Sequence, residues 1–185
     1  MDIIDNFIKI KQVELAPNTH IIMSFGTFLK DDRILNCQLD ETTIKNFLKN
    51  ITTKKIKHRS VNNRIYKEDN MEYVIKNDGE ENITRECLAV ENVTLDTLGV
   101  RLKLILTNQI GLEKFPCKLH YRDIYNSSTI IIEYNNILEI HIITEERETI
   151  TNLKLEVQIL RQNIYEDKLI NSLHEIIALV KENLI

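Results

Sequence analysis

Polar and apolar residues alternate along most of the second half of this chain. The alternating stretches are rich in β-branched side chains and are bounded by Asn, Gly or Ser; they cover residues 99–109, 118–125, 128–134, 136–146 and 151–160. Shorter runs of the same kind lie at 20–25, 64–66, 72–75 and 83–90. Because successive side chains of a strand point to opposite faces, this period of two predicts about eight or nine strands. Asn-Asp-Gly-Glu at 77–80 predicts a hairpin turn, and the basic stretch 54–64 predicts a loop.

Three other stretches place apolar residues at helical spacing, namely 2–12, 40–51 and 165–184. In the second of them Ile44, Phe47, Leu48 and Ile51 form one apolar stripe, and Asp40 is a suitable N-cap. Helices near both ends with meandering strands between them predict an α+β fold built on a large antiparallel sheet. Closure of that sheet into a barrel would leave no unpaired edge strand.

Several of the predicted strands carry charged residues at every second position. Arg101 and Lys103 share one face of their stretch, and Lys118 and Arg122 share a face of the next. Two arrangements give this pattern: a one-sided sheet whose charged face meets solvent, or a barrel whose polar faces line a hydrophilic tunnel. Alternation decides which residues share a face but not which face is inside, so both arrangements stay open at this point.

Composition narrows the class of protein without identifying a function. With 185 residues, 43% hydrophobic and 28% charged, the chain has the make-up of one globular domain over residues 1–185. Its formal net charge of −4 gives no reason to expect non-specific binding to DNA or to an anionic membrane. No apolar run approaches the roughly 20 residues that span a bilayer. The cysteines, Cys37, Cys87 and Cys117, form neither a metal-binding pair nor a disulfide framework, which favours an intracellular, reducing compartment.

The strand motifs occur in an order that resembles a known family. Residues 20–28, His-Ile-Ile-Met-Ser-Phe-Gly-Thr-Phe, end like a strand that reads E-h-E-x-R-F-G-T-F, where h is hydrophobic. GVRLKL from 99 is similar to V-R-h-S-h, KLHYRDIY from 118 to R-x-K-x-R-x-S-Y, ILEIHII from 137 to h-D-h-T-h-V, and LKLEVQIL from 153 to a closing E-V-E. Over nearly its whole length the chain thus resembles the tunnel-type, metal-dependent RNA 5′-triphosphatases of mRNA capping, chiefly those encoded by large DNA viruses.

This resemblance implies a closed antiparallel eight-stranded β-barrel flanked by N-terminal, mid-chain and C-terminal helices. Its interior would bind a triphosphate and a divalent cation such as Mg²⁺ or Mn²⁺. A hard cation needs oxygen ligands, and carboxylates two residues apart on one strand project to the same side, so two facing E-x-E strands can hold one ion. Basic residues on other strands would contact the phosphate oxygens. The candidate phosphate contacts in this sequence are Arg101, Lys118 and Arg122, which stand at basic positions of the family, and Lys103, which stands where the family has a small polar residue.

The carboxylate positions that the resemblance implies are degenerate. His20 and Ile22 occupy both positions in the first strand, and Gln158 occupies one of the two in the last strand. Glu156 is therefore the one glutamate retained among four, and Ser24 stands where the family has an arginine. Because each lost ligand removes stabilisation of charge in the transition state, we expect hydrolysis to be slower by orders of magnitude.

These positions favour a barrel that has lost catalysis and acts as a subunit or partner module in a viral-type mRNA capping or transcription apparatus. The expected partners are capping or transcription subunits and the 5′ end of RNA, with no membrane. The expected location is the cytoplasm, a virion or a viral factory.

The alternative function is an active metal-dependent polynucleotide 5′-triphosphatase that removes the γ-phosphate of nascent mRNA with a rearranged ligand set. In that case Glu139 or Glu133 joins Glu156 as a metal ligand. A third hypothesis is a plain RNA-end binder that holds phosphates through Arg101 and Arg122 without hydrolysis. His20, His120, His141 and Glu156 would offer a softer set suited to Zn²⁺ if all faced one interior. Three histidines on three strands lack the local spacing of a zinc site, which favours structural or solvated histidines.

Overall fold

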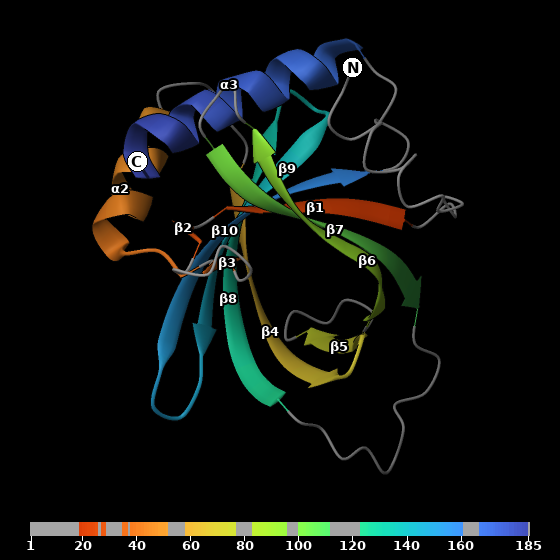
Figure 1. Cartoon of the computed structure of the whole chain (residues 1–185). Coiled ribbons are helices and arrows are strands. Elements are labelled where there is room, and N and C mark those ends of the chain that lie inside the picture. Colours follow the sequence, from red (N-terminus) through yellow and green to blue (C-terminus); the bar gives the residue numbers. More distant parts are fainter. Residues whose placement is uncertain are drawn as a thin grey trace.

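A curled antiparallel sheet makes up most of the structure (Figure 1). The computed structural model describes residues 19–25, 27–28, 35–36, 38–51, 58–76, 83–95, 100–111, 123–160 and 167–184. The strands of the large sheet are β1 (Thr19–Phe25), β4 (His58–Glu68), β5 (Met71–Lys76), β6 (Ile83–Leu95), β7 (Val100–Gly111), β8 (Asp123–Tyr134), β9 (Leu138–Glu146) and β10 (Thr151–Leu160). Two short strands, β2 (Thr27–Phe28) and β3 (Leu35–Asn36), pair separately.

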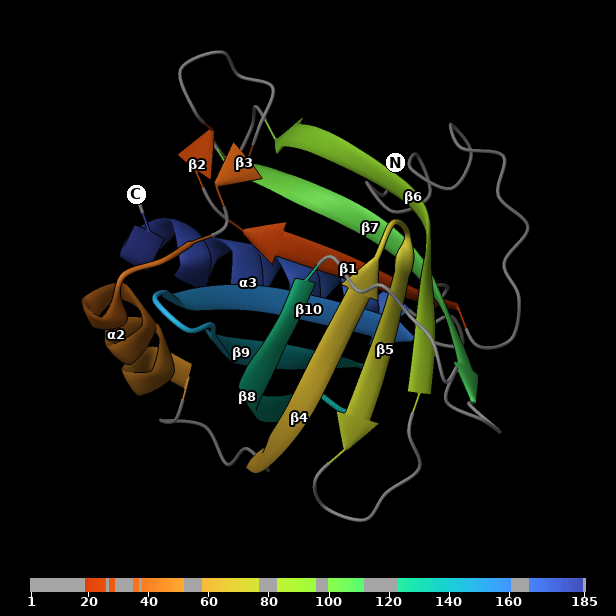
Figure 2. The same cartoon turned by 90° about the horizontal axis from the view of Figure 1, so that it is seen from below.

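The hydrogen-bonded order within the described residues is β1-β10-β9-β8-β4-β5-β6-β7, and β1 also pairs with β7. The sheet therefore curls until its first and last strands meet, as the views in Figures 1 and 2 show. Most neighbours in this order are also neighbours in sequence. The pairing of β4 with β8, from Lys67 opposite Asp123 to His58 opposite Ile132, joins segments that are far apart in the chain.

Tight turns connect two of the described hairpins, β4–β5 and β8–β9. Asn135 and Asn136, between β8 and β9, have φ angles of 53° and 59°, and Asp69, between β4 and β5, has a φ of 50°. Asn and Asp tolerate this left-handed region better than other residues with a Cβ atom. The twist of such turns matches the twist of the flanking strands, which fixes the register of each hairpin.

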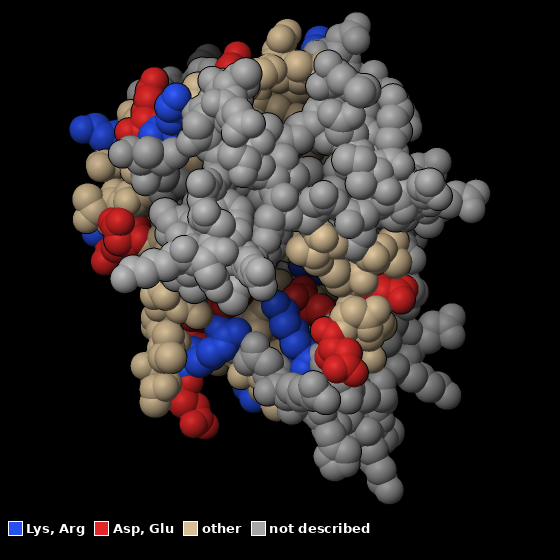
Figure 3. Space-filling view, in the orientation of Figure 1, with Lys and Arg blue, Asp and Glu red and all other residues tan. Residues whose placement is uncertain are grey.

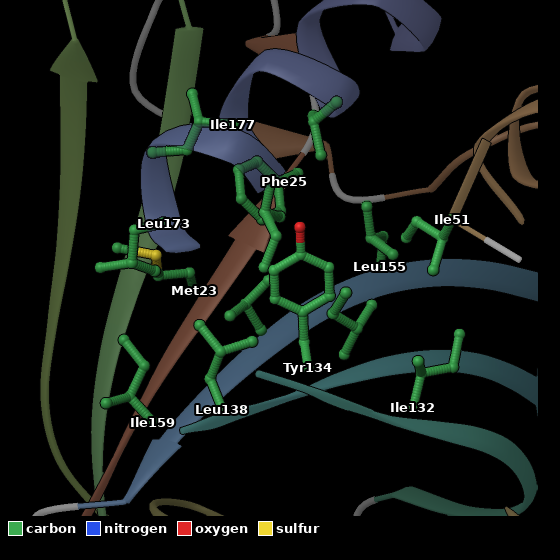
Figure 4. Packing of buried hydrophobic residues seen from close by; sticks show 14 of the residues in the cluster. Met23, Phe25, Ile51, Ile132, Tyr134, Leu138, Leu155, Ile159, Leu173 and Ile177 are labelled. Atoms are coloured by element: carbon green, nitrogen blue, oxygen red, sulfur yellow. The ribbon is translucent and has the colours of Figure 1, made fainter. Parts of the chain in front are cut away.

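The main hydrophobic core lies outside the curled sheet, between its outer face and two helices, α2 (Glu41–Ile51) and α3 (Asp167–Leu184). Asp40 caps α2, because its Oδ1 accepts the Thr43 backbone N–H at 2.8 Å. Figure 4 shows Met23 beside Leu173 of α3, within the buried cluster. The remaining sheet residues of this core are Ile21, Phe25, Ile132, Tyr134, Leu138, Ile140, Ile142, Leu155, Val157 and Ile159. These residues alternate along their strands with polar residues, whose side chains therefore point to the inside of the curl.

The structure confirms the coarse prediction of a curled antiparallel sheet with a mid-chain and a C-terminal helix. The polar faces of the strands turn inward, so the one-sided sheet with a solvated charged face is wrong. The predicted helix at 2–12 and the predicted turn at 77–80 lie outside the described residues. Neither of the described helices is long and apolar enough to cross a membrane.

Two local predictions are wrong. The stretch 54–64 was expected to be a loop, but β4 begins at His58, and both of its faces carry polar residues that hide the period of two. The stretches 118–125 and 128–134 were expected to be separate strands, but β8 runs without a break from Asp123 to Tyr134. Its central Asn-Ser-Ser resembles a turn in sequence, yet these residues pair with both β4 and β9, and such pairing outweighs local propensity.

Candidate functional site

The inside of the curled sheet holds a cavity of about 270 Å³. Alternate residues of seven described strands line it, from β1, β4, β5, β6, β8, β9 and β10. Figure 3 shows basic and acidic side chains gathered together around a hollow in this face of the molecule. The charged residues among the described lining are Arg59, Lys67, Lys76, Arg85, Lys154, Glu72, Glu139, Glu145 and Glu156.

A second hydrophobic cluster, the inner apolar cluster, borders this cavity. It consists of Ile65, Val74, Ile83 and Tyr125, which come from β4, β5, β6 and β8 and are all buried. The interior of an eight-stranded barrel is just wide enough to be filled by side chains or to hold one small ligand. The inner apolar cluster therefore fills part of the interior, and the open space is a pocket bounded by packed side chains.

Glu72 on β5 lies between two basic residues beside the inner apolar cluster. Its Oε2 lies 3.3 Å from Lys67 Nζ, and its Oε1 lies 3.3 Å from Arg85 Nη1. Lys67 Nζ also lies 5.4 Å from the centroid of the Tyr125 ring. Burial is the largest influence on Lys67 and disfavours its charged form. The charge of Glu72, the interactions with Tyr125 and the charge of Glu145 together outweigh burial and raise the pKa of Lys67. The charge of Glu72 is thus neutralised by groups that belong to the protein itself.

Glu145 on β9 is held in the same way. It is 4% exposed, and its two carboxylate oxygens lie 2.7 Å from Arg147 Nη1 and 2.7 Å from Lys154 Nζ. Burial acts to raise the pKa of Glu145, but the hydrogen bonds from Lys154 and Arg147 and the charges of Lys154 and Lys67 outweigh it, so this pKa is lowered. The guanidinium of Arg147 lies 4.1 Å from the centroid of the Tyr125 ring, and burial raises the pKa of this tyrosine. Tyr125 is therefore a neutral ring between two cations.

The degenerate positions of the resemblance lie together on β1 and β10. His20, Glu156 and Gln158 line the cavity, and Ile22 lines an adjoining pocket together with Glu156. Ile22 pairs with Gln158, and Ser24 pairs with Glu156, across the two strands. Ser24 is buried, and its hydroxyl donates a hydrogen bond to Glu156 Oε1 at 3.3 Å. The retained glutamate thus has a serine hydroxyl as its partner where the family has a positive charge.

Glu139 on β9 forms a pair with His141 directly beside these positions, since Glu139 pairs with Gln158 and His141 with Glu156 across β9 and β10. His141 Nε2 lies 2.8 Å from Glu139 Oε2, and the hydrogen bond from His141 lowers the pKa of Glu139 in spite of partial burial. His20 lies near both groups: burial, followed by the charge of Arg85, lowers the pKa of His20, while Glu139 acts in the opposite direction. Glu133 pairs with Glu139 across β8 and β9 but is exposed.

The residues at the implied metal position do not fit a hard divalent cation such as Mg²⁺ or Mn²⁺. Ile22 has no ligand atom, and Gln158 and His20 supply neutral groups in place of carboxylates. Across the described ranges, no three or more His, Cys, Asp or Glu side chains are placed to hold a metal ion. The zinc-binding set includes His120, which lies outside the described residues. The donor set therefore gives no basis for a metal-assisted step.

The predicted phosphate contacts fall largely outside what the structure describes. Lys118 and Arg122 lie outside the described residues. Arg101 and Lys103 are in β7, where Lys103 pairs with Ser24 and Arg101 pairs with Thr94, but their side chains are not described. Their role as phosphate contacts remains a prediction.

Sequence reasoning missed several charged residues that the structure brings into the cavity. Arg59 and Lys67 escaped because β4 was not recognised along its full length. Glu145 shares the face of Glu139 on β9, so alternation alone was enough to find it. Glu72 gives no such signal, because its partners Lys67 and Arg85 belong to other strands.

Comparison with known proteins reveals relatives in structure but not in sequence. No family model and no curated protein matches the sequence. The RNA triphosphatase Pct1 of S. pombe, solved in complex with the Spt5 CTD, superposes with a TM-score of 0.73 over 97% of this chain and 93% of that one, at 10% identity. The chain has the fold of the tunnel-type RNA triphosphatases. The resemblance found in the strand motifs is therefore confirmed at the level of the tunnel fold.

Two further relatives show how widely the tunnel fold extends. The Mimivirus capping enzyme triphosphatase superposes with a TM-score of 0.62 at 10% identity, over 96% of each chain. The protein HpAC1 from Hippeastrum, a putative adenylyl cyclase with a dominant triphosphatase activity, superposes with a TM-score of 0.53 at 6% identity, over 89% of this chain and 88% of that one. At such low identity the tunnel fold is shared, while activity depends on the residues inside the barrel.

Proposed function

We propose that this chain is a single tunnel-fold domain over residues 1–185 that has lost triphosphatase catalysis. On this proposal it works as a subunit or partner module in a viral-type mRNA capping or transcription apparatus, inside the infected cell or the virion. Arg101, Lys103, Lys118 and Arg122 are its proposed contacts to the 5′ phosphate of RNA.

One observation carries the loss of catalysis: the groups at the implied metal position are engaged with one another or cannot bind an ion. Ile22 and Gln158 face each other across β1 and β10, and Glu156 accepts a hydrogen bond from Ser24. A hydrocarbon and an amide in place of two carboxylates remove the negative charge that would attract Mg²⁺ or Mn²⁺. Without the ion, the γ-phosphate loses the largest source of charge stabilisation in such a reaction.

Two structural relatives support a role beside other proteins of mRNA synthesis. Pct1 is an RNA triphosphatase that was solved with the Spt5 CTD bound, and the Mimivirus relative is the triphosphatase of a capping enzyme. Loss of the metal ligands inside a barrel leaves its outer surface unchanged, so that surface could still bind such proteins.

The proposal is tested by incubating the purified chain with RNA that carries a γ-labelled 5′-triphosphate, in the presence of Mg²⁺ or Mn²⁺. We expect no release of phosphate above that of the buffer. Robust release that disappears in Glu156→Ala but persists in Glu146→Ala would establish the alternative, an active triphosphatase with Glu139 and Glu156 in a rearranged ligand set. Glu146 is a suitable control because it lies on an adjacent strand and is exposed.

The partner role has its own test. Purified capping and RNA polymerase subunits from the same source are mixed with the chain, and the complexes are sized by light scattering during gel filtration. A defined complex with one of these subunits is the expected result. Failure of every subunit to bind would leave the loss of catalysis standing and refute the partner role.

A further inference from the structure

The charges that line the described part of the cavity almost cancel. Five lysine or arginine residues and four glutamates contribute, which leaves one excess positive charge when the histidines are counted as neutral. Lys67 and Arg85 pair with Glu72, and Lys154 pairs with Glu145, so much of the basic charge is already engaged. A triphosphate without a metal ion would bring several negative charges into a lining that already holds four glutamates. A single phosphate group, with a charge of about −1.5 to −2, matches the charge of this described part of the lining better.

One wall of the cavity offers neutral hydrogen-bonding groups. Asn63 on β4 and Ser127 on β8 are paired across the strands, and Thr129 follows on the same face of β8. The hydroxyls of Ser127 and Thr129 lie 3.4 Å apart. Among the described residues, Asn63 Oδ1 is buried and has no hydrogen-bond partner. A buried acceptor without a donor costs free energy, so this atom is a place where a ligand N–H or O–H would be bound favourably.

The same cavity combines this polar wall with apolar surface and a small volume. The inner apolar cluster and Ile131 border it. A volume of about 270 Å³ equals the liquid volume of about nine water molecules and lies just below the range of about 300–1,000 Å³ that is usual for ligand pockets. The space therefore suits one small molecule that has both an apolar face and hydrogen-bond donors.

A phosphate-binding group is available where the cavity meets solvent. Arg59 lines the cavity, is exposed, and lies close enough to Glu139 to lower the pKa of that carboxyl group. Its guanidinium can donate two parallel N–H hydrogen bonds to the oxygens of one phosphate. The ribose and base of the same ligand would then reach the wall that carries Asn63.

We propose that the cavity binds a nucleoside 5′-monophosphate without a metal ion, with its phosphate on Arg59 and its base or ribose on the wall formed by Asn63, Ser127 and Thr129. The ligand is either a free nucleotide or the 5′-monophosphate end of an RNA. This inference rests on the proposed loss of catalysis but not on the proposed protein partner.

The test measures binding by calorimetry with AMP, GMP, adenosine, ATP and a short 5′-monophosphate RNA, each with Mn²⁺ and with EDTA. We expect AMP or GMP to bind more tightly than adenosine and at least as tightly as ATP, with equal affinity in Mn²⁺ and in EDTA. Asn63→Ala should weaken binding about fivefold, because one hydrogen bond is lost. Asn62→Ala, which changes the exposed residue next to it on the outer face, should change affinity by less than twofold.

Each outcome bears on the inference separately from the proposed function. If the 5′-monophosphate RNA binds but AMP and GMP do not, the inference is supported and the RNA end is identified as the source of the ligand. Absence of binding by both monophosphate forms to the folded protein overturns it, as does equal affinity of the Asn63→Ala and Asn62→Ala variants. ATP that binds more tightly than AMP only in Mn²⁺ also overturns it. The hydrolysis assay with triphosphate RNA decides independently whether catalysis is lost.

Discussion

Replacement of Glu145 by Gln tests whether ion pairs inside the barrel stabilise this fold. The substitution keeps the size of the side chain and removes its charge. Arg147 and Lys154, each 2.7 Å from the carboxylate, would then face a neutral amide. Loss of one partner leaves two basic groups of the interior without their counter-charge.

The size of the effect follows from the burial of the three groups. Removal of one partner from a fully buried ion pair costs about 3–5 kcal/mol, whereas exposed pairs contribute about 1 kcal/mol or less. Glu145 is 4% exposed, but the side chains of Arg147 and Lys154 are 26% and 27% exposed, so water compensates part of the loss. We therefore expect the free energy of unfolding to fall by about 2 kcal/mol.

Urea denaturation at pH 7, followed by circular dichroism, measures this change. With an m-value of about 2 kcal/mol/M, the midpoint of Glu145→Gln should lie about 1 M below that of the wild type. Glu146→Gln, at the neighbouring exposed position, should stay within about 0.5 kcal/mol of the wild type. Coincident midpoints for the two variants would refute the reasoning that the internal ion pairs stabilise the barrel.

The pH dependence provides a second measurement on the same variant. The pKa of Glu145 is lowered in the folded state, so the unfolded chain takes up a proton first as the pH falls below the ordinary value of 4.5. The stability contributed by this group is present above that value and is lost as the pH falls through the folded pKa. In Glu145→Gln this part of the acid-induced loss should be absent.

Three other predictions concern the implied metal position, the outer core and the pH response. Combined replacement of His20, Ile22 and Gln158 by Glu should create Mn²⁺ binding, measured as a rise in melting temperature with Mn²⁺ that the wild type does not show. Equal responses of both proteins would contradict the conclusion that the wild-type residues do not fit a hard divalent cation. Phe47→Ala should lower the melting temperature by about 10 °C, because Phe47 is 1% exposed and its ring fills part of the core. The control, Asn46→Ala at an exposed position, should leave the melting temperature nearly unchanged. Burial lowers the pKa of His20, so the unfolded chain binds a proton before the folded protein does as the pH falls below the ordinary value of 6.5. The free energy of unfolding should therefore decline below pH 6.5. In His20→Gln this decline should be smaller, as measured by urea titrations at pH 7.5 and 5.5.

Elements with a clear period were predictable from sequence. The stripe that contains Ile44 and Phe47 predicted a helix over 40–51, and α2 spans Glu41–Ile51. The strands of the second half also followed their alternation, since β9 and β10 lie within the stretches predicted for them. Where both faces of a strand are polar, as in β4, the alternation vanishes, and only the part of β4 at 64–66 was predicted.

The interior was predictable only in part. Alternation placed His20, Ile22 and Ser24 on one face of their strand, and Glu156 and Gln158 on one face of theirs. Strand pairing then brought the two faces together, with the Ser24 hydroxyl 3.3 Å from a Glu156 carboxylate oxygen. Nothing local in the sequence indicates that contact, because the two residues are 132 positions apart.

The sequence by itself determined which residues share a face of each strand and helix, since those periods follow from backbone geometry within a few residues. It also determined which groups are present at the positions where the resemblance of the strand motifs implies a metal ion. Only the tertiary structure decided that the polar faces turn inward and that Lys67 and Arg85 neutralise Glu72. It also decided that Lys154 and Arg147 neutralise Glu145 and that, within the described ranges, Asn63 Oδ1 is an acceptor without a donor. The reason is physical: these contacts depend on the register between paired strands and on how far the sheet curls, and neither leaves a periodic trace in the chain.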